Sequence, residues 1–501
     1  CSIFSTTSIH TSTITMARAT RRGICKNMSK QPNILWICTD QQRYDTIGAL
    51  GNKYVDTPNI DRLVADGIAF THAYCQSPIC TPSRASFLTG MYPSTVHSTR
   101  NGNSMFNKEQ ILVTKYLADA GYDCGLIGKL HLASAFGRIE PRTDDGYSFW
   151  EYSHAPRDDW PKGHGYADWV RKKGSVLGDL IKNSDGVPPE LHQTTWCAEK
   201  TIEFIRKQRT GPWMASVNIY DPHPPFNPPS CYRDKFDPEK MPGPLFRDSD
   251  LKQQMALEKI DFQSKVRRPN ELDIRDPKFP ERGRSAEGRQ LQAAYYAMIK
   301  LIDDQVGNII EALENDGVRD NTVIIFTSDH GEMLGDHGLI QKGCRFYEGL
   351  VRVPLIISWP ERFLKDVQSD ALVELIDKAP TILELAGVDI PSRMQGRSLL
   401  PILYGEKPLD KHRDHVRCEY YDALDEPDNS FATMFRNERY KLVVYHGHDV
   451  GELYDLQEDP EEFENMWSEP EAQPLKLDLL RSSFDASMFA LDCGSERIGP
   501  M

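Results

Sequence analysis

The longest apolar runs in the chain are short and almost uninterrupted, and three of them run into an aspartate. Residues 33–40 read NILWICTD, residues 213–221 read WMASVNIYD and residues 321–331 read NTVIIFTSDHG. Continuous apolar character is typical of parallel strands that are buried on both faces. We therefore predict buried strands here and in two shorter runs, 124–128 and 352–358.

Amphipathic stretches separate these strands. Apolar residues recur at helical spacing in four segments: 57–67, 111–121, 194–208 and 288–315. Helices that alternate with buried strands are typical of α/β proteins. The predicted fold class is therefore α/β, with a large, mostly parallel sheet flanked by helices.

Three aspartates stand where predicted strands end, namely Asp40, Asp221 and Asp329. In open parallel sheets, ligands bind beyond the carboxyl ends of the strands. We therefore expect these three carboxylates to converge on one site.

The pattern changes twice along the chain. Residues 222–285 are rich in proline and charge and lack periodicity, which predicts an excursion over the sheet. Short apolar stretches alternating with turns, as in 431–456, predict antiparallel strands near the C-terminal end. The predicted organisation is a disordered leader (1–30), an α/β domain that carries the catalytic site (31–404), a smaller C-terminal α+β subdomain with an antiparallel sheet (405–490) and a tail (491–501).

Composition excludes some classes of partner. The 501 residues carry a net charge of −14, which argues against binding to nucleic acid or to an anionic membrane. No apolar run approaches the roughly 18 residues of a membrane-spanning helix. The 11 cysteines include no CxxC pair, as is usual in a reducing compartment.

The segment before Asp40 contains no acidic residue and lacks the apolar core of a secretory signal. It fits either an organellar leader or translated upstream sequence with a working start at Met16 or Met28. We favour the second interpretation and expect a cytoplasmic protein.

Candidate chemistry begins at residues 77–90, SPICTPSRASFLTG. Thr81 can cap a helix, Pro82 suits its first turn and Gly90 suits its end, so Cys80 should lie at a helix N-terminus. Such a position favours an anion, and Arg84 lies one turn further on. A buried structural thiol and a thiolate nucleophile both remain open, although phosphatase loops usually place the arginine six positions after the cysteine.

Cys80-Thr81-Pro82-Ser83-Arg84 resembles the sulfatase signature, C-x-P-x-R, in which the cysteine is oxidised to Cα-formylglycine. The resemblance covers roughly residues 32–465 and implies an alkaline-phosphatase-like fold and a sulfuric ester hydrolase. Further similar segments follow in the family's order: TPNIDRLVADGIAFTHAYCQSPIC, GYDCGLIGKLHL, DPHPPF, IIFTSDHGEMLGDHGL, RVPLII, GRSLLP and GELYDLQEDPEEFEN.

The resemblance also implies a mechanism. A separate maturation enzyme converts Cys80 to the aldehyde, which hydrates to a gem-diol. One hydroxyl attacks sulfur and gives a covalent sulfo-enzyme intermediate, and the other then expels sulfate. Covalent catalysis of this kind divides one difficult step into two.

By the same resemblance, Asp40, Gln41, Asp329 and His330 bind one divalent metal, and residue 80 completes the shell. Oxygen ligands suit Ca²⁺ best, with Mg²⁺ possible. Many sulfatases carry Asp in place of Gln41 and Asn in place of His330. The imidazole nitrogen of His330 leaves Mn²⁺ open.

Positive groups should bind the sulfate and protonate the leaving oxygen. By the resemblance, Lys129 binds the sulfate, and Lys342 lies near the sulfate and the bridging oxygen. His223 helps to bind sulfate or protonates the leaving oxygen, and His131 contacts the formylglycine or assists its proton transfers. Arg84 is expected to orient the diol, and Asn101 is a further candidate for substrate binding.

Two other functions remain as alternatives. Phosphonate monoester and phosphodiester hydrolases of the same superfamily share the metal set, but typically carry Tyr and Thr where this chain has Lys129 and His131. A sulfate-ester-binding protein with unmodified Cys80 is the second alternative. The expected substrate is a sulfated carbohydrate or another small organic sulfate, and the oligomeric state stays open.

Aromatic and histidine residues in 135–195 have no assigned role. His154, His164 and His192 could line the pocket, but we expect them in surface loops. Trp150, Trp160, Trp169 and Tyr166 could stack on a sugar ring, although core packing is the expected role for most of them.

Overall fold

The computed structural model describes residues 31–157, 162–183, 185–257, 260–261, 266–276, 279–424 and 429–491. The predicted leader, the end of the predicted tail and Trp160 lie outside these residues. Across the described part of the chain, no helix combines the length and the apolar character that crossing a membrane requires.

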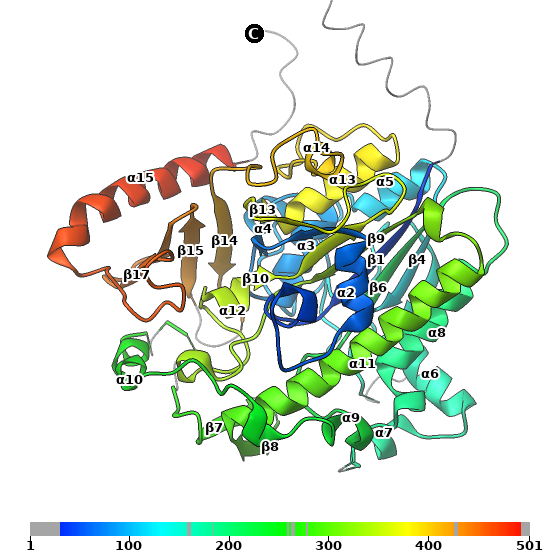
Figure 1. The fold of residues 1–501 in the computed structure, drawn as a ribbon, viewed down its shortest axis with the longest axis horizontal. Coiled ribbons are helices and arrows are strands. Elements are labelled where there is room, and N and C mark those ends of the chain that lie inside the picture. The colour runs from blue at the N-terminus through cyan, green and yellow to red at the C-terminus, as the bar shows by residue number, and fades with distance from the viewer. Residues whose placement is uncertain are drawn as a thin grey trace, which may run out of the picture.

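An eight-stranded sheet forms the centre of the molecule, in the order β12-β2-β11-β9-β1-β6-β4-β5 (Figure 1). Neighbouring strands are parallel except where β11 pairs with β9 and β2. The mostly parallel sheet predicted from the sequence is therefore confirmed. Its strands are β1 (Asn33–Thr39), β2 (Gly67–Phe70), β4 (Asp123–Gly128), β5 (Tyr147–Tyr152), β6 (Trp213–Ile219), β9 (Thr322–Ser328), β11 (Leu355–Ser358) and β12 (Val367–Ser369).

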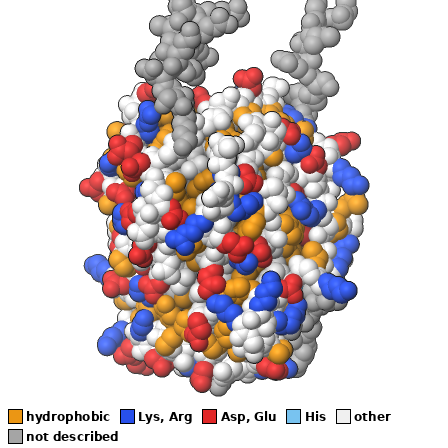
Figure 2. All heavy atoms as spheres, turned by 90° about the vertical axis from the view of Figure 1, so that its right-hand side faces the viewer, with side chains coloured by type: hydrophobic (Ala, Val, Ile, Leu, Met, Phe, Trp, Pro, Cys, Tyr) orange, Lys and Arg blue, Asp and Glu red, His pale blue; other side chains and the backbone are white. Residues whose placement is uncertain are grey.

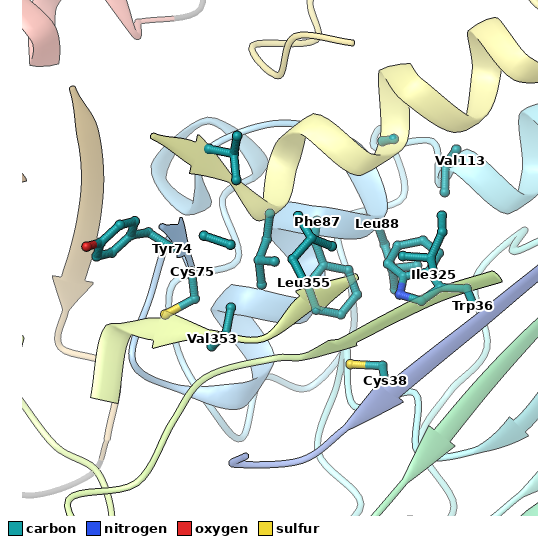
Figure 3. Close-up of a cluster of buried hydrophobic side chains, with 14 of the residues drawn as sticks. Trp36, Cys38, Tyr74, Cys75, Phe87, Leu88, Val113, Ile325, Val353 and Leu355 are labelled. Carbon is teal, nitrogen blue, oxygen red and sulfur yellow. The ribbon is translucent and has the colours of Figure 1, made fainter. Parts of the chain in front are cut away.

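Helices cover both faces of this sheet because buried side chains alternate along each strand. On β1, Trp36 belongs to one hydrophobic cluster with Phe87, and Leu35 belongs to the opposite cluster with Trp196. Figure 3 shows the first cluster, where Trp36 and Ile325 of the sheet lie near Phe87. The main helices are α2 (Pro58–Ala65), α3 (Cys80–Thr89), α5 (Val113–Asp119), α6 (Gly165–Lys172), α8 (Gln193–Ile205), α11 (Gly288–Asn315) and α13 (Lys378–Leu385).

Two predicted elements differ from the observed ones. The helix predicted to reach Gly67 ends at Ala65, and Gly67 begins β2 instead. A side chain there would meet the carbonyl oxygen of Ile357 at 2.4 Å, so glycine permits the close pairing of β2 with β11. The strand predicted at 352–358 is divided at Pro354 into β10 (Arg352–Val353) and β11.

Shorter elements surround the sheet. Residues 222–285 contain α9 (Ser230–Arg233), α10 (Asp248–Met255), β7 (Leu272–Asp276) and most of β8 (Phe279–Ala286). Strand β10 pairs with β3 (Ala73–Tyr74), which also pairs with β13 (Val373–Glu374). The remaining short helices are α4 (Pro93–Val96), α7 (Leu177–Leu180), α12 (Glu348–Val351) and α14 (Leu400–Leu403).

A second, antiparallel sheet follows near the C-terminal end. Its strands are β14 (Val416–Tyr421), β15 (Phe431–Arg436), β16 (Tyr440–Tyr445) and β17 (Gly451–Asp455). Helix α15 (Gln473–Phe489) contacts β15 and β16 and lies at the edge of the molecule (Figure 1). The antiparallel sheet was predicted, and the exact division at residue 404 stays a prediction.

The face turned toward the viewer in Figure 2 carries basic and acidic side chains interspersed with hydrophobic ones. The charge of −14 is therefore not gathered as one acidic patch on this face. Mixed charge of this kind is ordinary for a protein surface.

Candidate metal centre and active site

Two neighbouring strands and one helix bring the candidate ligands together. Asp40 follows β1, Asp329 follows β9, and Cys80 is the first residue of α3. One ligand atom each from Asp40, Cys80, Asp329 and His330 lies within 4.8 Å of the others, and all four residues are buried. We call these four residues the metal-ligand cluster.

The carboxylate of Asp329 accepts three hydrogen bonds. Its Oδ1 accepts from the backbone N–H groups of Gln41 (3.0 Å) and His330 (2.9 Å), and its Oδ2 accepts from Arg84 Nε (2.8 Å). These bonds point the carboxylate into the cluster and hold it there.

Asp40 faces positive charge. Its Oδ2 lies 2.5 Å from Lys129 Nζ and 3.4 Å from the Arg84 guanidinium. Burial disfavours the charged carboxylate, but Lys129, His223, Arg84 and Lys342 outweigh this cost and hold the pKa of Asp40 well below its usual value. The carboxylate is therefore ionised and able to bind a cation.

The Cys80 sulfur lies at the centre of the arrangement. Lys342 Nζ donates to it at 2.7 Å, His330 Nε2 lies at 3.1 Å and Asp40 Oδ1 at 3.7 Å. Burial and Asp40 raise the pKa of the thiol, but Lys129, Lys342 and His330 outweigh them, and the pKa is lowered overall. For His330, burial and the positive charge of Lys342 lower the pKa, but Asp329 and Cys80 outweigh them and raise it to about 9.

The start of α3 differs in one detail from the prediction. Ile79, not Thr81, occupies the N-cap position, and the helix begins at Cys80. The backbone N–H of Thr81 donates to Asn101 Oδ1 at 2.9 Å, so Asn101 braces the first turn of the helix. Gly90 ends the helix with a φ of 72°, as predicted.

Gln41 adopts a φ of 71° and turns its amide between two charged groups. Its Oε1 accepts from Lys342 Nζ at 3.0 Å, and its Nε2 donates to the buried Glu332. Glu332 was not identified from the sequence. It orients Gln41 so that the amide oxygen lies on the side of Lys342 and the metal-ligand cluster.

The loop after β4 carries Lys129 and His131, and a buried glutamate holds its shape. Glu140 accepts from the backbone N–H groups of His131 (2.7 Å) and Leu132 (3.0 Å) and from the Tyr152 hydroxyl (2.9 Å). His131 has a φ of 58°, a conformation that these bonds stabilise. Glu140 lies in a segment without periodicity and was missed in the sequence.

His154 contacts the same loop. Its ring meets the ring of His131 edge to face, with 4.4 Å between centroids. His154 is half-buried in a loop, whereas the assignment of His164 and His192 to surface loops was wrong. His164 is buried beside Ser153, and His192 is buried at the N-cap of α8.

The last cationic candidate, His223, approaches from another loop. His223 is half-buried, and its Nδ1 lies 2.7 Å from the Pro224 carbonyl oxygen. Its ring packs against Tyr220, whose own ring lies 5.5 Å from Lys129 Nζ. Burial, followed by the positive charge of Lys342, holds the pKa of His223 well below its usual value. The imidazole is therefore neutral in this state.

Asp221 does not join the cluster, contrary to the predicted convergence of three aspartates. Its carboxylate accepts from Thr194 Oγ1 at 3.1 Å and lies 3.7 Å from His192 Nε2. Its backbone carbonyl oxygen accepts from Asp40 N at 3.3 Å. The strand end is close, but the side chain turns toward α8.

Core packing explains the aromatic residues of 162–183. Tyr166 and Trp169 are buried and contact each other, and Tyr166 also contacts Trp196. Trp150 is half-buried and stacks on Tyr152. Tyr166 and Trp169 therefore belong to the core, as expected for most of the set.

The donor set fits a divalent cation. It offers two carboxylates, the His330 imidazole, residue 80 and, beside them, the Gln41 amide oxygen. Oxygen-rich sets of this type suit Ca²⁺, Mg²⁺ or Mn²⁺. Arg84, Lys129 and Lys342 add positive charge around residue 80, so the site can also hold an anionic substrate.

Comparison with known proteins agrees with this chemistry. The family model described as Sulfatase matches residues 32–388, and the model described as N-sulphoglucosamine sulphohydrolase, C-terminal, matches residues 335–486. An arylsulfatase from Clostridium perfringens is 30% identical and aligns with 90% of this chain and 93% of its own length. An N-acetylglucosamine-6-O-sulfatase from Bacteroides thetaiotaomicron is 29% identical, with 91% and 86% covered.

Solved structures show the same fold. The phosphonate monoester hydrolase of Agrobacterium radiobacter superposes with a TM-score of 0.77 at 27% identity, covering 92% of this chain and 96% of that protein.

Proposed function

Because the chain belongs to the sulfatase family and is a sulfuric ester hydrolase, we propose that it cleaves a terminal sulfate ester with a nucleophile made from Cys80. The nucleophile is Cα-formylglycine in its hydrated form, produced by a separate maturation enzyme. The contacts of Cys80 with His330, Asp40 and Lys342 support this proposal most strongly.

Asp40, Gln41, Asp329 and His330 would hold one divalent metal, which we propose to be Ca²⁺. When bound, such an ion lowers the pKa of a hydroxyl beside it and attracts sulfate oxygens. Arg84 donates to Asp329 and so keeps that carboxylate in place beside residue 80.

The remaining groups would act on the sulfate. Lys129, which is paired with Asp40, and Lys342, which donates to residue 80, would stabilise charge on the sulfate oxygens. His223 is neutral in the free protein, and an anion beside it would raise its pKa toward that of a proton donor. We assign it protonation of the leaving oxygen, and His131 the proton transfers at the hydrated aldehyde.

The proposed substrate is a sulfated saccharide or another small organic sulfate. One relative is named as an N-acetylglucosamine-6-O-sulfatase and another as a choline-sulfatase. The two names represent a sugar and a small organic cation, so both classes belong in a substrate screen.

Mass spectrometry and kinetics test this function together. The tryptic peptide that contains residue 80, from protein made in its native host, should carry an aldehyde in place of the thiol. Cys80→Ala should lower kcat at least about a thousandfold, because the nucleophile is removed. Cys197→Ala, at a buried helical position remote from the metal-ligand cluster, is the matched control. Full sulfatase activity in protein whose Cys80 is wholly unmodified would refute the proposal.

Phosphonate monoester hydrolysis is the second candidate, favoured by the structural similarity to the Agrobacterium enzyme. Lys129 and His131 favour sulfate, because phosphonate monoester hydrolases of this superfamily typically carry Tyr and Thr at these positions, which suit a substrate with a second ester group. Parallel kinetics on an aryl sulfate and an aryl phosphonate monoester distinguish the two. A much larger kcat/KM for the phosphonate would reverse our choice.

A further inference from the structure

Glu332 is a buried residue that follows the candidate ligand His330 by two positions. Its backbone N–H donates to the Gly349 carbonyl oxygen at 3.0 Å. Its backbone carbonyl oxygen accepts from Arg43 Nη1 at 2.9 Å. These two bonds anchor the position without using the side chain, so a change in the carboxylate should leave the backbone in place.

The first partner of the Glu332 carboxylate is the side-chain amide of Gln41. Gln41 Nε2 donates to Glu332 Oε2, and Gln41 Oε1 accepts from Lys342 Nζ at 3.0 Å. An ammonium group can only donate, so the amide atom beside Lys342 has to be the oxygen. The amide –NH2 group then faces Glu332, which has to present an acceptor. Both neighbours therefore require the same orientation of the amide.

The backbone of Gln41 is held by other groups. Its N–H donates to Asp329 Oδ1 at 3.0 Å, and its carbonyl oxygen accepts from the Tyr295 hydroxyl at 2.6 Å. These bonds leave the side-chain torsions unset. Among the described residues, the amide itself forms hydrogen bonds with Lys342 and Glu332 alone. The direction of its oxygen therefore depends on these two residues.

The second partner of the carboxylate is the loop that leads to Lys342. Glu332 Oε1 accepts from the backbone N–H groups of Leu334 (3.1 Å) and Gln341. These two residues have φ values of 52° and 59°, in the left-handed region that side chains rarely adopt. Lys342 comes directly after Gln341, and its Nζ donates to the sulfur of residue 80 at 2.7 Å. The carboxylate thus also fixes the backbone from which Lys342 reaches residue 80.

We propose that Glu332 is a positioning residue for both Gln41 and Lys342. One carboxylate oxygen keeps the amide oxygen of Gln41 on the side of the metal-ligand cluster, and the other keeps Lys342 against residue 80. The inference rests on the proposed function, because it requires a divalent metal beside Gln41. Groups that orient a metal ligand typically change metal affinity or activity about 10- to 100-fold when they are altered.

Glu332→Gln tests this role at almost unchanged side-chain volume. The new amide oxygen can still accept from Leu334 and Gln341, but the new –NH2 group would face the –NH2 group of Gln41. Gln41 then has to turn its amide over, which places –NH2 on the side of Lys342 and the metal. Calorimetric titration of the full-length protein with Ca²⁺ should give a dissociation constant about 10- to 100-fold above that of wild type. The kcat/KM for an aryl sulfate should fall by a similar factor.

Two further variants separate position from charge. Gln41→Glu/Glu332→Gln reverses donor and acceptor and keeps the net charge, so it should recover most of the lost Ca²⁺ affinity, unlike two additive substitutions. Glu332→Asp also keeps the charge, but its carboxylate is one methylene shorter. It should weaken Ca²⁺ binding at least about tenfold if position matters.

Glu462→Gln is the matched control, because Glu462 is also buried and also accepts from a backbone N–H, that of Glu348, at 2.7 Å. Its dissociation constant for Ca²⁺ should equal that of wild type. Unchanged affinity in Glu332→Gln or Glu332→Asp would overturn the inference, as would failure of the double variant to recover affinity. A wild-type protein that binds none of Ca²⁺, Mg²⁺ and Mn²⁺ would refute the proposed metal site itself, and the inference with it.

Discussion

Two buried groups of charges in this molecule have similar composition but different organisation. The catalytic group consists of the metal-ligand cluster with Arg84, Lys129 and Lys342. The second, which we call the interface cluster, joins β16 to α12 and consists of Glu348, Lys441 and Glu462 with Tyr74 and Arg352.

The interface cluster is closed on itself. Lys441 Nζ donates to Glu462 (2.8 Å) and to the Phe346 carbonyl oxygen (2.9 Å), and it forms an ion pair with Glu348 (2.6 Å). Glu348 also accepts from the Tyr74 hydroxyl at 2.8 Å. A cluster whose charges pair with one another stabilises the packing of β16 against α12 and leaves no charge for a ligand.

The catalytic group, in contrast, is organised to bind a metal ion and an anionic substrate. Three cations surround two carboxylates, and four potential ligand atoms converge within 4.8 Å. Lys342 and His223 are half-buried, so the group is reached from one side. Buried charge alone therefore does not identify a functional site. A functional site is identified by ligand atoms that converge and by more positive than negative side chains.

The largest effect that separates the two groups should come from Asp40→Asn. The variant loses a charged ligand and leaves Lys129 and Arg84 with less opposing charge. We expect loss of bound metal by elemental mass spectrometry and at least about a thousandfold lower kcat/KM. Asp221→Asn is the matched control, because Asp221 also follows a sheet strand but bonds to Thr194. Equal metal loss in both variants would contradict the assignment.

The next largest effect should come from Lys441→Met in the interface cluster. It leaves Glu348 and Glu462 buried without their common cation, which should lower the free energy of unfolding by about 3–5 kcal/mol. The kcat of the folded fraction should not change. Denaturant unfolding and active-site titration measure the two quantities, and a loss of activity without a loss of stability would contradict this distinction.

The same variant should change the acid response. Burial opposes ionisation of Glu348, but Lys441 with Arg436 and Arg352 holds its pKa below the usual value. Because its pKa is lower in the folded than in the unfolded protein, ionised Glu348 stabilises the fold at pH values above its unfolded pKa of about 4.5. That stability is lost as pH falls below this value, and the loss should be smaller in Lys441→Met.

The smallest effect should come from Lys378, a buried lysine near the catalytic group. Its Nζ has no hydrogen-bond partner among the described residues and lies 4.0 Å from the Phe87 ring centroid. Burial lowers the pKa of Lys378 to about 7. The unfolded chain binds this proton up to about pH 10.4, so the cost to stability is full below pH 7 and declines between pH 7 and 10.

Lys378→Met should therefore raise the free energy of unfolding by about 2 kcal/mol at pH 6 and by less at pH 9. Thermal unfolding at the two pH values measures the difference. An advantage that is equal at both pH values would mean that Lys378 stays charged in the folded protein.

The members of the metal-ligand cluster were predictable because their positions depend on local pattern and on a motif. Asp40 and Asp329 follow unmistakable buried strands, and Cys80 lies in a motif with a helix start and a helix end. Glu140 and Glu332 were missed because each acts through backbone N–H groups or an amide in a loop. Such contacts depend on the path of the chain and leave no periodic signal in the sequence.

The amino-acid sequence by itself determined the parallel strands and the helices between them, because burial selects apolar residues at regular spacing. It thereby also placed Asp40 and Asp329 at strand ends. Only the tertiary structure decided that Asp221 turns away from the metal-ligand cluster while Asp40 and Asp329 enter it. It also decided that Glu332 holds the amide of Gln41. Both choices depend on contacts between segments far apart in the chain, and local patterns do not encode those contacts.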